Sequence, residues 1–499
     1  MENAGVGGWP ARRARMTPDR TAFVFEGRAI SYAEVHTRTT KLAARLREAG
    51  VGAGDRVAYL GPNHTALAET MFATHLLGAI FVPLNFRLTA PEIGFMRDDC
   101  GPAVLIYAPE CAEVVRALPG TTTLLVPLGP DYESWLAEGD STPIDVRVGL
   151  DDIALILYTS GTTGRPKGAM LSHANLLWNT FNMLIGVDVT TDEMTLISAP
   201  LFHVAALNQT LLPTFAKGGC SVIMPSWDVD GCYDLIEKHG ITWMFGVTTM
   251  FAAFARSPRW ATADLSSLRN LMSGGAPIPA ALIRTYQERG LVFCQGYGLT
   301  ETAPGATFLE AGQSVRKVGS AGVPVFFTNV RVVRPDLTDT VVGEPGEVLV
   351  QGPNVTPGYW QNPEATDAVF AAGGWLRSGD IGAFDGEGHL YLVDRVKDMY
   401  ISGGENVYPA EVEGVLFEHP AVAEAAVVGV PDATWGEVGR AFVVCRAAVT
   451  AGELREFLVG RLAGYKIPRY FDLVDDLPRT GSGKLQKGEL RGRPLDRSD

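Results

Sequence analysis

Residues 153–168 read I-A-L-I-L-Y-T-S-G-T-T-G-R-P-K-G, and this stretch decides the fold. The apolar run Ile153–Tyr158 predicts a short buried strand, which places the following loop at the edge of a sheet. Glycines let a backbone approach a ligand closely, and backbone N–H groups with hydroxyls form a donor surface that suits phosphate oxygens. We therefore predict a loop that binds nucleotide phosphates. Its members are Thr159, Ser160, Gly161, Thr162, Thr163, Gly164 and Lys167.

The spacing of this loop, G-x-x-G-x-x-K, differs from that of the common P-loop. A plain turn between two apolar runs is the simpler interpretation, because clusters of Gly, Ser and Thr are typical of turns. The density of hydroxyl donors and the lysine favour the phosphate loop.

The composition is that of an ordinary globular protein. The chain has 499 residues, enough for two or more domains, of which 46% are hydrophobic and 20% charged. The formal net charge of −14 argues against a nucleic-acid partner and against attachment to anionic lipid by a basic patch. The six cysteines show no C-x-x-C spacing, so neither a disulfide framework nor a zinc site is predicted.

No targeting or membrane segment is predicted. The N-terminal residues M-E-N-A-G-V-G-G-W-P-A-R-R-A-R lack the apolar core of a signal peptide. The longest apolar stretch, from Met71 to Leu84, contains His75 and Pro83 and is too short to cross a bilayer. We expect a cytoplasmic enzyme without an integral membrane segment. A homodimer is compatible with the sequence.

Strands and amphipathic helices alternate from about Thr21 to Gln351. The capping box Ser31-Tyr-Ala-Glu34 predicts a helix that runs toward Glu48, and a strand follows at 56–60. Further helices are predicted at 65–77 and 230–239, and further strands at 79–82, 220–224 and 242–245. This β-α-β order predicts mostly parallel sheets covered by helices.

The pattern of predicted elements changes after about Gly319, where short strands replace the alternation of strands and helices. Short strands at 329–333, 346–350 and 389–393 predict a small barrel-like β subdomain, and the polar segment Asp394–Asp398 predicts a hinge. Beyond it, helices at 409–417 and 453–462 and strands at 422–430 and 440–445 predict a compact α/β unit. The predicted fold class is α/β, with an N-terminal domain at 1–394 and a mobile C-terminal domain at 395–499.

Eight motifs in order give the chain a resemblance to the adenylate-forming superfamily of acyl-CoA synthetases, luciferases and peptide-synthetase adenylation domains. They are Tyr158–Gly168, Ala199–Val204, Ser273–Pro277, Gly296–Thr302, Arg377–Asp380, Asp394–Asp398, Ser402–Val407 and Pro478–Lys484. The wording of H-V-A-A-L and I-S-G-G-E-N-V-Y-P-A-E is closest to bacterial fatty acyl-CoA synthetases. The hinge motif begins Asp394-Arg395 rather than the commoner Gly-Arg.

The resemblance implies two half-reactions that use ATP, Mg²⁺ and coenzyme A. A carboxylate attacks the α-phosphate of ATP, giving an acyl-adenylate and pyrophosphate, and the coenzyme A thiol then displaces AMP. Two anions meet in the first step, so the site must supply positive charge and preorganised donors. The residues implied as catalytic are Lys167, His203, Thr300, Glu301 and Lys484.

The resemblance also implies the nucleotide contacts. Tyr297, between Gly296 and Gly298, would stack on adenine opposite Gly275 and Ala276. Thr300 would reach the α-phosphate, while Glu301, with Thr159, would bind the metal. Asp380, Leu392 and Arg395 would contact the ribose. Outside the motif, Tyr297 would read as a core aromatic, Glu301 as a solvated acid and Asp380 as a turn residue.

Lys484 lies in a Gly-Ser-Gly-Lys loop and, by resemblance, enters the site only for adenylation. Lys397 occupies the hinge position, about which the C-terminal domain would rotate. Gly403 and Gly404 would then let the pantetheine arm of coenzyme A pass close to the backbone. His203 would line the acyl and thiol channel, although a structural histidine explains it equally well.

The predicted acyl pocket is small or apolar and holds no cation for a second carboxylate. Its members are His203, Val204, Ala205, Leu207, Val247, Thr248, Gly274, Gly298 and Leu299. Gly296 stands where malonate-activating relatives carry an arginine, so a dicarboxylate is disfavoured. We expect an acid:CoA ligase for a monocarboxylic acid, with a medium-to-long fatty acid as the main interpretation and an aryl-propenoic acid as the alternative.

Three rival functions stay open. Luciferase-like oxidation of the adenylate would use the same first half-reaction, and the activated group could instead pass to an acceptor other than coenzyme A. A nucleotide sensor that kept only the fold is the third rival, against which the joint presence of Glu301 and Lys484 speaks.

Overall fold

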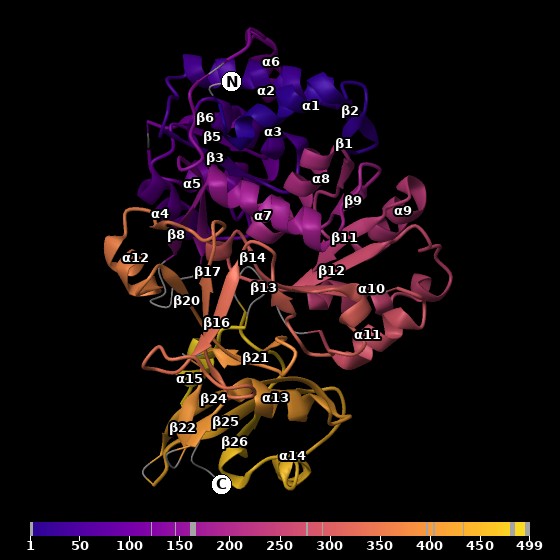
Figure 1. Ribbon diagram of the computed structural model, residues 1–499, viewed down its shortest axis with the longest axis vertical. Coiled ribbons are helices and arrows are strands. Elements are labelled where there is room, and N and C mark those ends of the chain that lie inside the picture. Colours follow the sequence, from indigo (N-terminus) through magenta and orange to yellow (C-terminus); the bar gives the residue numbers. More distant parts are fainter. Residues whose placement is uncertain are drawn as a thin grey trace. The chain divides into compact units, whose positions relative to one another are not determined.

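The computed structural model describes residues 3–120, 122–144, 146–159, 166–275, 278–291, 293–395, 398–402, 405–432, 434–479 and 485–494, with only the backbone of Arg395 and Asn406. Contacts divide the chain into two compact units (Figure 1). The first comprises residues 1–330 and 350–376, and the second comprises 331–349 and 377–499. The second unit thus also gathers residues that precede 395. The domain boundary at 394/395 concerns motion about the hinge and stays a prediction.

A seven-stranded sheet of the first unit contains the strand of the opening stretch. Its order is β18-β8-β7-β4-β3-β5-β6. Strands β7, β4, β3, β5 and β6 run parallel, and β8 and β18 continue the sheet antiparallel. The bounds are β3 Arg56–Leu60, β4 Ile80–Leu84, β5 Val104–Tyr107, β6 Leu124–Pro127, β7 Ile153–Thr159, β8 Lys167–Ser172 and β18 Gly358–Tyr359. Burial on both faces explains why β4 is apolar throughout.

A nine-stranded sheet of the same unit has the order β15-β14-β13-β12-β11-β9-β10-β1-β2. Its central strands, from β13 to β1, run parallel. At one edge β2 pairs antiparallel with β1, and at the other β14 pairs antiparallel with β13 and β15 antiparallel with β14. The bounds are β1 Thr21–Phe25, β2 Arg28–Ser31, β9 Met194–Ile197, β10 Cys220–Ile223, β11 Trp243–Gly246, β12 Asn270–Gly274, β13 Phe293–Gly298, β14 Gly305–Leu309 and β15 Val323–Pro324.

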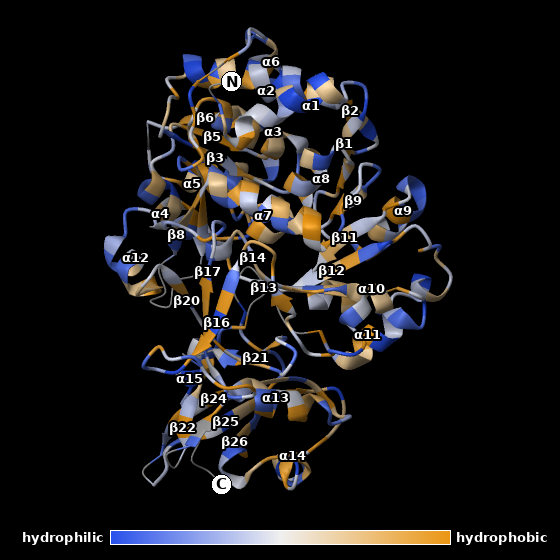
Figure 2. Ribbon diagram, in the orientation of Figure 1, coloured by the Kyte–Doolittle hydropathy of each residue, from blue (hydrophilic) through white to orange (hydrophobic). Residues whose placement is uncertain are grey.

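Helices cover these sheets. They are α1 Trp9–Met16, α2 Tyr32–Glu48, α3 Thr65–Leu76, α4 Ala90–Cys100, α5 Ala112–Ala117, α6 Pro130–Ala137, α7 His173–Gly186, α8 Leu212–Lys217, α9 Val229–His239, α10 Thr248–Arg256, α11 Ala280–Gln287 and α12 Pro363–Val369. Every residue of α3 is buried, and one apolar cluster joins this helix to Tyr59 of the first sheet and Trp243 of the second. The two sheets therefore share a core. Strand β9 is largely hydrophobic, whereas α12 contains both hydrophilic and hydrophobic residues (Figure 2).

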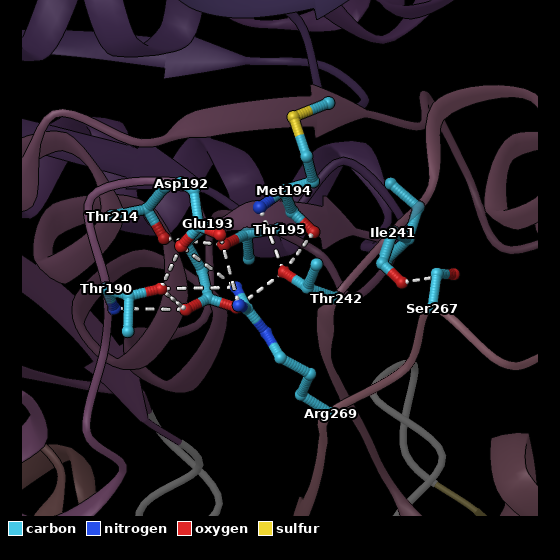
Figure 3. A network of polar contacts seen from close by, with 10 residues as sticks. All are labelled: Thr190, Asp192, Glu193, Met194, Thr195, Thr214, Ile241, Thr242, Ser267 and Arg269. Carbon is cyan, nitrogen blue, oxygen red and sulfur yellow. Dashed lines mark hydrogen bonds and ion pairs between the residues drawn. The ribbon is translucent and has the colours of Figure 1, made fainter.

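A polar network fastens the amino ends of β9, β11 and β12 (Figure 3). Glu193, only 1% exposed, accepts hydrogen bonds from the N–H of Thr190 (3.1 Å) and from the hydroxyl of Thr242. The guanidinium of Arg269 lies 3.3 Å from the Glu193 carboxylate and also pairs with Asp192. Burial of the Glu193 charge is thus offset by donors from three strand starts. The network fixes the amino ends of these strands, whereas the glycine-rich turns lie at the carboxyl ends of β12 and β13.

The chain passes between the units through a five-stranded sheet, and the boundary between the units falls within β16, β17 and β20. Its order is β16-β17-β20-β19, and β21 pairs with β20. The bounds are β16 Asn329–Val333, β17 Gly346–Gln351, β19 Phe370–Ala371, β20 Trp375–Phe384 and β21 Leu390–Arg395. This is the small β subdomain predicted after Gly319.

The remainder of the second unit is a sheet of order β23-β22-β25-β24, to which β26 adds beside β25. Separate apolar clusters involve Val427 and Val428, which are neighbours on one strand. Since successive side chains of a strand point to opposite faces, this sheet is covered on both. The bounds are β22 Tyr400–Ser402, β23 Glu405–Val407, β24 Val422–Asp432, β25 Gly436–Cys445, β26 Tyr470–Leu473, α13 Pro409–Phe417, α14 Ala451–Leu458 and α15 Lys487–Arg491.

The α/β fold class is confirmed, and two details differ from the expectations. The predicted helix at 453–462 lies at Ala451–Leu458, because Thr450 caps it and Val459 leaves the helical conformation. At the predicted capping box, Ser31 accepts the Glu34 N–H at 3.1 Å, but the Glu34 carboxylate pairs with Arg28. Every helix in the described ranges is too short or too polar to span a bilayer.

Candidate active site

The predicted phosphate loop connects two strands that pair with each other. Thr159 ends β7, Lys167 begins β8, and the two are partners in the antiparallel register. The Thr159 hydroxyl lies 3.4 Å from the Lys167 carbonyl oxygen. The Tyr158 hydroxyl donates to the Asp99 carboxylate at 2.5 Å. The pKa of this phenol is raised, mainly because the side chain is buried. Both ends of the loop are thus held by the sheet.

Gly168 explains one glycine of the motif. A Cβ atom there would lie 2.7 Å from a methyl group of Ile156 and 3.3 Å from Cβ of Trp360. The Trp360 N–H also donates to the Gly168 carbonyl at 2.7 Å. The close approach of the 358–360 segment to β8 therefore requires a residue without a side chain.

Tyr359 connects the loop to the carboxylate that was predicted to bind metal. The Lys167 Nζ lies 5.5 Å from the centre of the Tyr359 ring. The hydroxyl of the same ring donates to Oε1 of Glu301 at 2.8 Å. Burial and then the Glu301 charge raise the pKa of Tyr359, so the phenol remains a hydrogen-bond donor at neutral pH. Residues more than 130 positions apart in sequence thus meet around one ring.

The short turn Thr300–Thr302 is fastened from two sides. Asn354, fully buried, donates to the carbonyl oxygens of Thr302 and Gly305, both at 2.6 Å. The Thr356 N–H donates to the Glu301 carbonyl at 2.7 Å. The backbone of Glu301 is therefore fixed independently of its carboxylate.

Glycines shape the carboxyl ends of β12 and β13. A Cβ atom on Gly298 would lie 1.6 Å from the Pro304 carbonyl oxygen, and one on Gly274 would lie 2.9 Å from the Gly296 oxygen. Gly275 has φ +84°, in the region that favours glycine. Tyr297, half-buried, lies between Gly296 and Gly298. The carboxyl ends of the adjacent parallel strands β12 and β13 thus bring Gly274, Gly275 and Tyr297 to the same end of the sheet.

The segment that holds His203 is positioned by Asn63. The Asn63 side chain donates to the carbonyls of Ala199 (3.0 Å) and Met224 (3.1 Å) and accepts the Leu201 N–H (2.7 Å). His203 is half-buried, and its ring lies 4.4 Å from that of Phe202 between centres. A buried asparagine after β3 of one sheet therefore fixes the chain that follows β9 of the other.

A π-helix follows at Ala206–Leu211 and includes Leu207, which is buried. Its Gln209 is 6% exposed, and its Oε1 has no hydrogen-bond partner among the described residues. Its Nε2 lies 3.8 Å from the position that a Cβ on Gly296 would take. The Gln209 amide thus lies beside Gly296, the position at which the resemblance implies an arginine in malonate-activating relatives.

The other predicted acyl-pocket residues divide by burial. Val204 and Gly274 are buried, Ala205, Thr248, Gly298 and Leu299 are half-buried, and Val247 is exposed. Val247 Cγ1 lies 4.0 Å from the position of a Cβ on Gly275, which places it beside the predicted adenine wall.

The predicted ribose residues lie in the second unit. Asp380 of β20 is 7% exposed, and its N–H donates to the Ser378 hydroxyl at 3.0 Å. Asp380 and Arg395 are register partners across β20 and β21, and Leu392 is half-buried beside them, opposite Gly382. The structure thus brings the three strand positions together.

Ten predicted positions lie outside the described residues. They are Ser160, Gly161, Thr162, Thr163, Gly164, Ala276, Lys397, Gly403, Gly404 and Lys484. The side chain of Arg395 is also outside the description.

No cluster of three or more His, Cys, Asp or Glu residues suited to a metal occurs in the described ranges. A site with one carboxylate, Glu301, fits Mg²⁺ better than metals that need a cage of protein ligands, because Mg²⁺ is commonly held by one or two carboxylates and substrate phosphates. The half-buried Glu301 accepts a hydrogen bond from the Tyr359 hydroxyl, and Lys167 lies over the ring of the same tyrosine.

Sequence reasoning missed four residues that organise this site: Asn63, Gln209, Asn354 and Tyr359. The polar run Asn208–Thr210 inside an otherwise apolar segment was a signal for Gln209. For the other three the signal was weak: Asn63 and Asn354 are of a residue type common in turns, and Tyr359 is a single aromatic residue in a two-residue strand.

Lys167 and Glu301 both contact Tyr359, and glycines lie at the carboxyl ends of β12 and β13. This arrangement is typical of nucleotide-binding sites in α/β enzymes. Two family models make the assignment specific: that of the AMP-binding enzyme matches residues 10–360, and that of the AMP-binding enzyme C-terminal domain matches residues 411–484. The chain belongs to the AMP-binding enzyme family.

Curated relatives of the chain are acid–CoA ligases. The chain is 52% identical to the feruloyl-CoA synthase of an Amycolatopsis species over 99% of this chain and all of the relative. It is 41% identical to the indoleacetate–CoA ligase of Aromatoleum aromaticum and 37% identical to a long-chain-fatty-acid–CoA ligase of Mycobacterium tuberculosis, each over 97% of both chains. The prediction of an AMP-forming acid–thiol ligase is confirmed.

Solved structures agree on the fold. The ATP-bound MatB of Rhodopseudomonas palustris matches with a TM-score of 0.91 at 32% identity, covering 97% of this chain and 98% of the other. The o-succinylbenzoate CoA synthetase of Bacillus subtilis, in complex with its acyl-adenylate, matches with a TM-score of 0.88 at 34% identity, covering 98% of both chains. The predicted family resemblance is therefore supported.

The main interpretation of the substrate needs correction. The fatty-acid ligase among these relatives is less similar to the chain than the feruloyl-CoA synthase is. The aryl alternative is the better supported one.

Proposed function

We propose that the chain is an ATP-dependent aryl-propenoate:CoA ligase. It would activate an aromatic monocarboxylic acid as the acyl-adenylate with release of pyrophosphate, and then form the thioester with release of AMP. The 52% identity to a feruloyl-CoA synthase over nearly the whole chain is the observation that carries this proposal. The 41% identity to an indoleacetate–CoA ligase supports an aromatic acid independently.

The residues of the acyl side agree with a flat, polar-tipped acid. Glycines at 274, 296 and 298 leave no side chain over the ends of β12 and β13, where a planar ring would lie. The Gln209 side chain approaches Gly296 with its Nε2, and its buried Oε1 has no hydrogen-bond partner among the described residues. An unpaired buried amide is costly in a pocket for a hydrocarbon chain, whereas a phenolic hydroxyl would satisfy it. We therefore propose a hydroxylated ring, as in 4-hydroxycinnamates.

In the first half-reaction, the loop from Thr159 to Lys167 would hold the β- and γ-phosphates. Glu301 and Thr159 would hold Mg²⁺, which offsets phosphate charge when it is bound. Tyr359 would orient the Glu301 carboxylate, since its hydroxyl occupies Oε1 and leaves Oε2 for the metal. Thr300 would donate to the α-phosphate. Lys484 would bridge that phosphate and the attacking carboxylate, because opposed negative groups need a cation between them.

The family resemblance also implies contacts to the nucleoside. Tyr297 would stack on adenine opposite Gly275 and Ala276. Asp380 would accept hydrogen bonds from the ribose hydroxyls, and Arg395 and Leu392 would contact the sugar. The register of β20 and β21 supports this assignment because it places Asp380 beside Arg395.

In the second half-reaction, the C-terminal domain would turn about Lys397, withdrawing Lys484 and presenting Gly403 and Gly404 to coenzyme A. His203 would line the channel shared by acid and thiol. A homodimer remains compatible with this scheme, which needs one chain only.

A pyrophosphate-release screen tests the proposal. Ferulate, 4-coumarate, cinnamate, indoleacetate, octanoate and palmitate would be compared in the presence of ATP and Mg²⁺, with and without coenzyme A. We expect the highest kcat/KM with a hydroxycinnamate and a thioester product only when coenzyme A is present. Preference for palmitate would overturn the substrate, and pyrophosphate release without any thioester would favour a different acceptor.

A further inference from the structure

The second unit contains a buried ion pair that the reaction scheme has not used. Lys487, the first residue of α15, has its Nζ 2.8 Å from Oε1 of Glu413 on α13. The two side chains are only 13% and 14% exposed. Pairs of this kind are costly to bury and strongly destabilising to break, because removal of one partner leaves an unpaired charge.

Glu413 also completes the edge of the sheet. Strand β24 is an end strand, and the Val427 N–H donates to the Glu413 carboxylate at 2.6 Å. Burial raises the pKa of Glu413, and the neighbouring Lys487 opposes that effect. One carboxylate therefore fixes helix α13, strand β24 and helix α15 to one another.

Lys487 follows Lys484 by three residues, and the chain between them is held tightly. Leu485 forms a bridge with Arg479, and the Gln486 N–H donates to the Pro478 carbonyl at 2.8 Å. Leu485 also packs on the apolar cluster that includes Phe442 and Leu490. The residues on the two sides of the 480–484 segment thus pair with each other, and the Lys487–Glu413 ion pair lies next to this pairing in the sequence.

Helix α13 carries this anchor to the other functional segments of the unit. It begins two residues after β23, which follows Gly403 and Gly404. The N–H of Ala410, in its first turn, donates at 2.7 Å to the carboxylate of Asp394, the first residue of the predicted hinge segment. Helix α13 therefore contacts both Lys487, which follows the 480–484 segment, and Asp394.

We propose that Glu413 and Lys487 are positioning residues for Lys484. The ion pair holds the base of the 480–484 loop on α13, so that Lys484 enters the adenylation site at a reproducible position when the unit moves. This inference rests on the proposed function, in which Lys484 acts in adenylation but not in thioester formation. A positional error of about 1 Å in such a group can cost on the order of 100-fold in rate.

The test separates the two half-reactions in the full-length protein. Lys487→Gln and Lys487→Arg would be compared with wild type in ferulate-dependent ATP–pyrophosphate exchange, and in thioester formation from supplied feruloyl-adenylate and coenzyme A. We expect Lys487→Gln to lose at least about tenfold in exchange and less than about twofold in thioester formation, because only adenylation needs the lysine. Lys487→Arg should recover most of the exchange activity, since arginine can keep the pair. Equal loss of both half-reactions, or no loss of either, would overturn the inference.

Two further variants keep the result interpretable. Arg334→Met removes an ion pair with Glu344 at the surface of the same unit and should leave both half-reactions unchanged. Lys484→Ala tests the premise: if it retains exchange, the proposed role of Lys484 fails, whereas loss of exchange in Lys484→Ala but not in Lys487→Gln refutes the anchor alone. Should Lys487→Gln fail to fold, Glu413→Gln, which keeps a partner for the Val427 N–H, is measured in its place.

Discussion

A single phenol joins the two halves of the candidate phosphate site. Tyr359 presents its ring face to Lys167 and its hydroxyl to Glu301. Hydrogen bonds to a charged group contribute about 1.5–3 kcal/mol. The orientation of the Glu301 carboxylate therefore depends on a residue that belongs to none of the eight motifs.

Tyr359→Phe should lower kcat/KM for ATP by about 10- to 100-fold, because it frees the Glu301 carboxylate to rotate away from the metal. The aromatic contact with Lys167 remains, so the free energy of unfolding should change much less than activity does. Pyrophosphate exchange at several Mg²⁺ concentrations measures the effect, which excess Mg²⁺ should partly rescue. Tyr107→Phe, in β5 of the same sheet, is the matched control; an activity loss of equal size there would refute the assignment.

Gln209 gives a prediction about selectivity. Gln209→Leu should reduce kcat/KM for ferulate by about tenfold, the effect of losing one hydrogen bond of about 1.4 kcal/mol. Cinnamate, which lacks the hydroxyl, should be used as well as before or better. The ratio of the two kcat/KM values is the measurement, and an equal change for both acids would contradict the proposed contact.

At the scale of elements, the N-terminal segment is locked onto α7 by a buried histidine pair. The Val6 N–H donates to Nδ1 of His173, the first residue of α7, and the His173 ring packs edge-on against His75 at 4.9 Å between centres. A Cβ on Gly7 would lie 2.5 Å from the His75 backbone, so only glycine allows this contact. Both imidazoles must stay neutral because burial lowers the pKa of His173 to about 4 and that of His75 well below its usual range.

Stability should therefore fall as the pH is lowered from about 6.5 to about 4. The unfolded chain, with an ordinary histidine pKa of about 6.5, gains protons in this range that folded His173 does not accept, and the loss from this group approaches about 3 kcal/mol. His173→Asn should be less stable than wild type at pH 7.5, and the gap should narrow by about that amount at pH 4. Urea unfolding at several pH values measures the gap, and a constant gap would disprove the assignment.

At the scale of the whole molecule, the chain consists of two compact units, and the predicted hinge residue Lys397 belongs to the second. The hinge hypothesis makes the two half-reactions separable. Lys397→Pro, which fixes φ near −65° and removes a backbone donor, should impair one half-reaction by about 100-fold more than the other.

Lys397→Ala removes the charge of the hinge residue but leaves its backbone free, so both half-reactions should stay within about threefold of wild type. Single-turnover formation of feruloyl-adenylate and of feruloyl-CoA from supplied adenylate provides the comparison. If proline at 397 slowed both steps alike, rotation about this residue would not be the link between them.

The sequence by itself determined the fold class and the family. Periodicity predicted the strands at 56–60 and 329–333 and the helix at 409–417 to the residue. These elements are specified by local patterns of apolar residues and by caps, which are properties of neighbours in the chain. The ordered motifs likewise predicted which residues gather at the carboxyl ends of β7, β12 and β13.

Only the tertiary structure decided which distant residues share a contact. Tyr359 meets Glu301, Asn63 fixes the chain before His203, Gln209 faces Gly296, and Glu413 meets Lys487. Each of these contacts is made by a single polar side chain, and its role depends on which residue the fold places opposite it. A hydrogen bond or ion pair is specific in space but leaves no periodic trace in the sequence, and for that reason the folded chain was needed to find them.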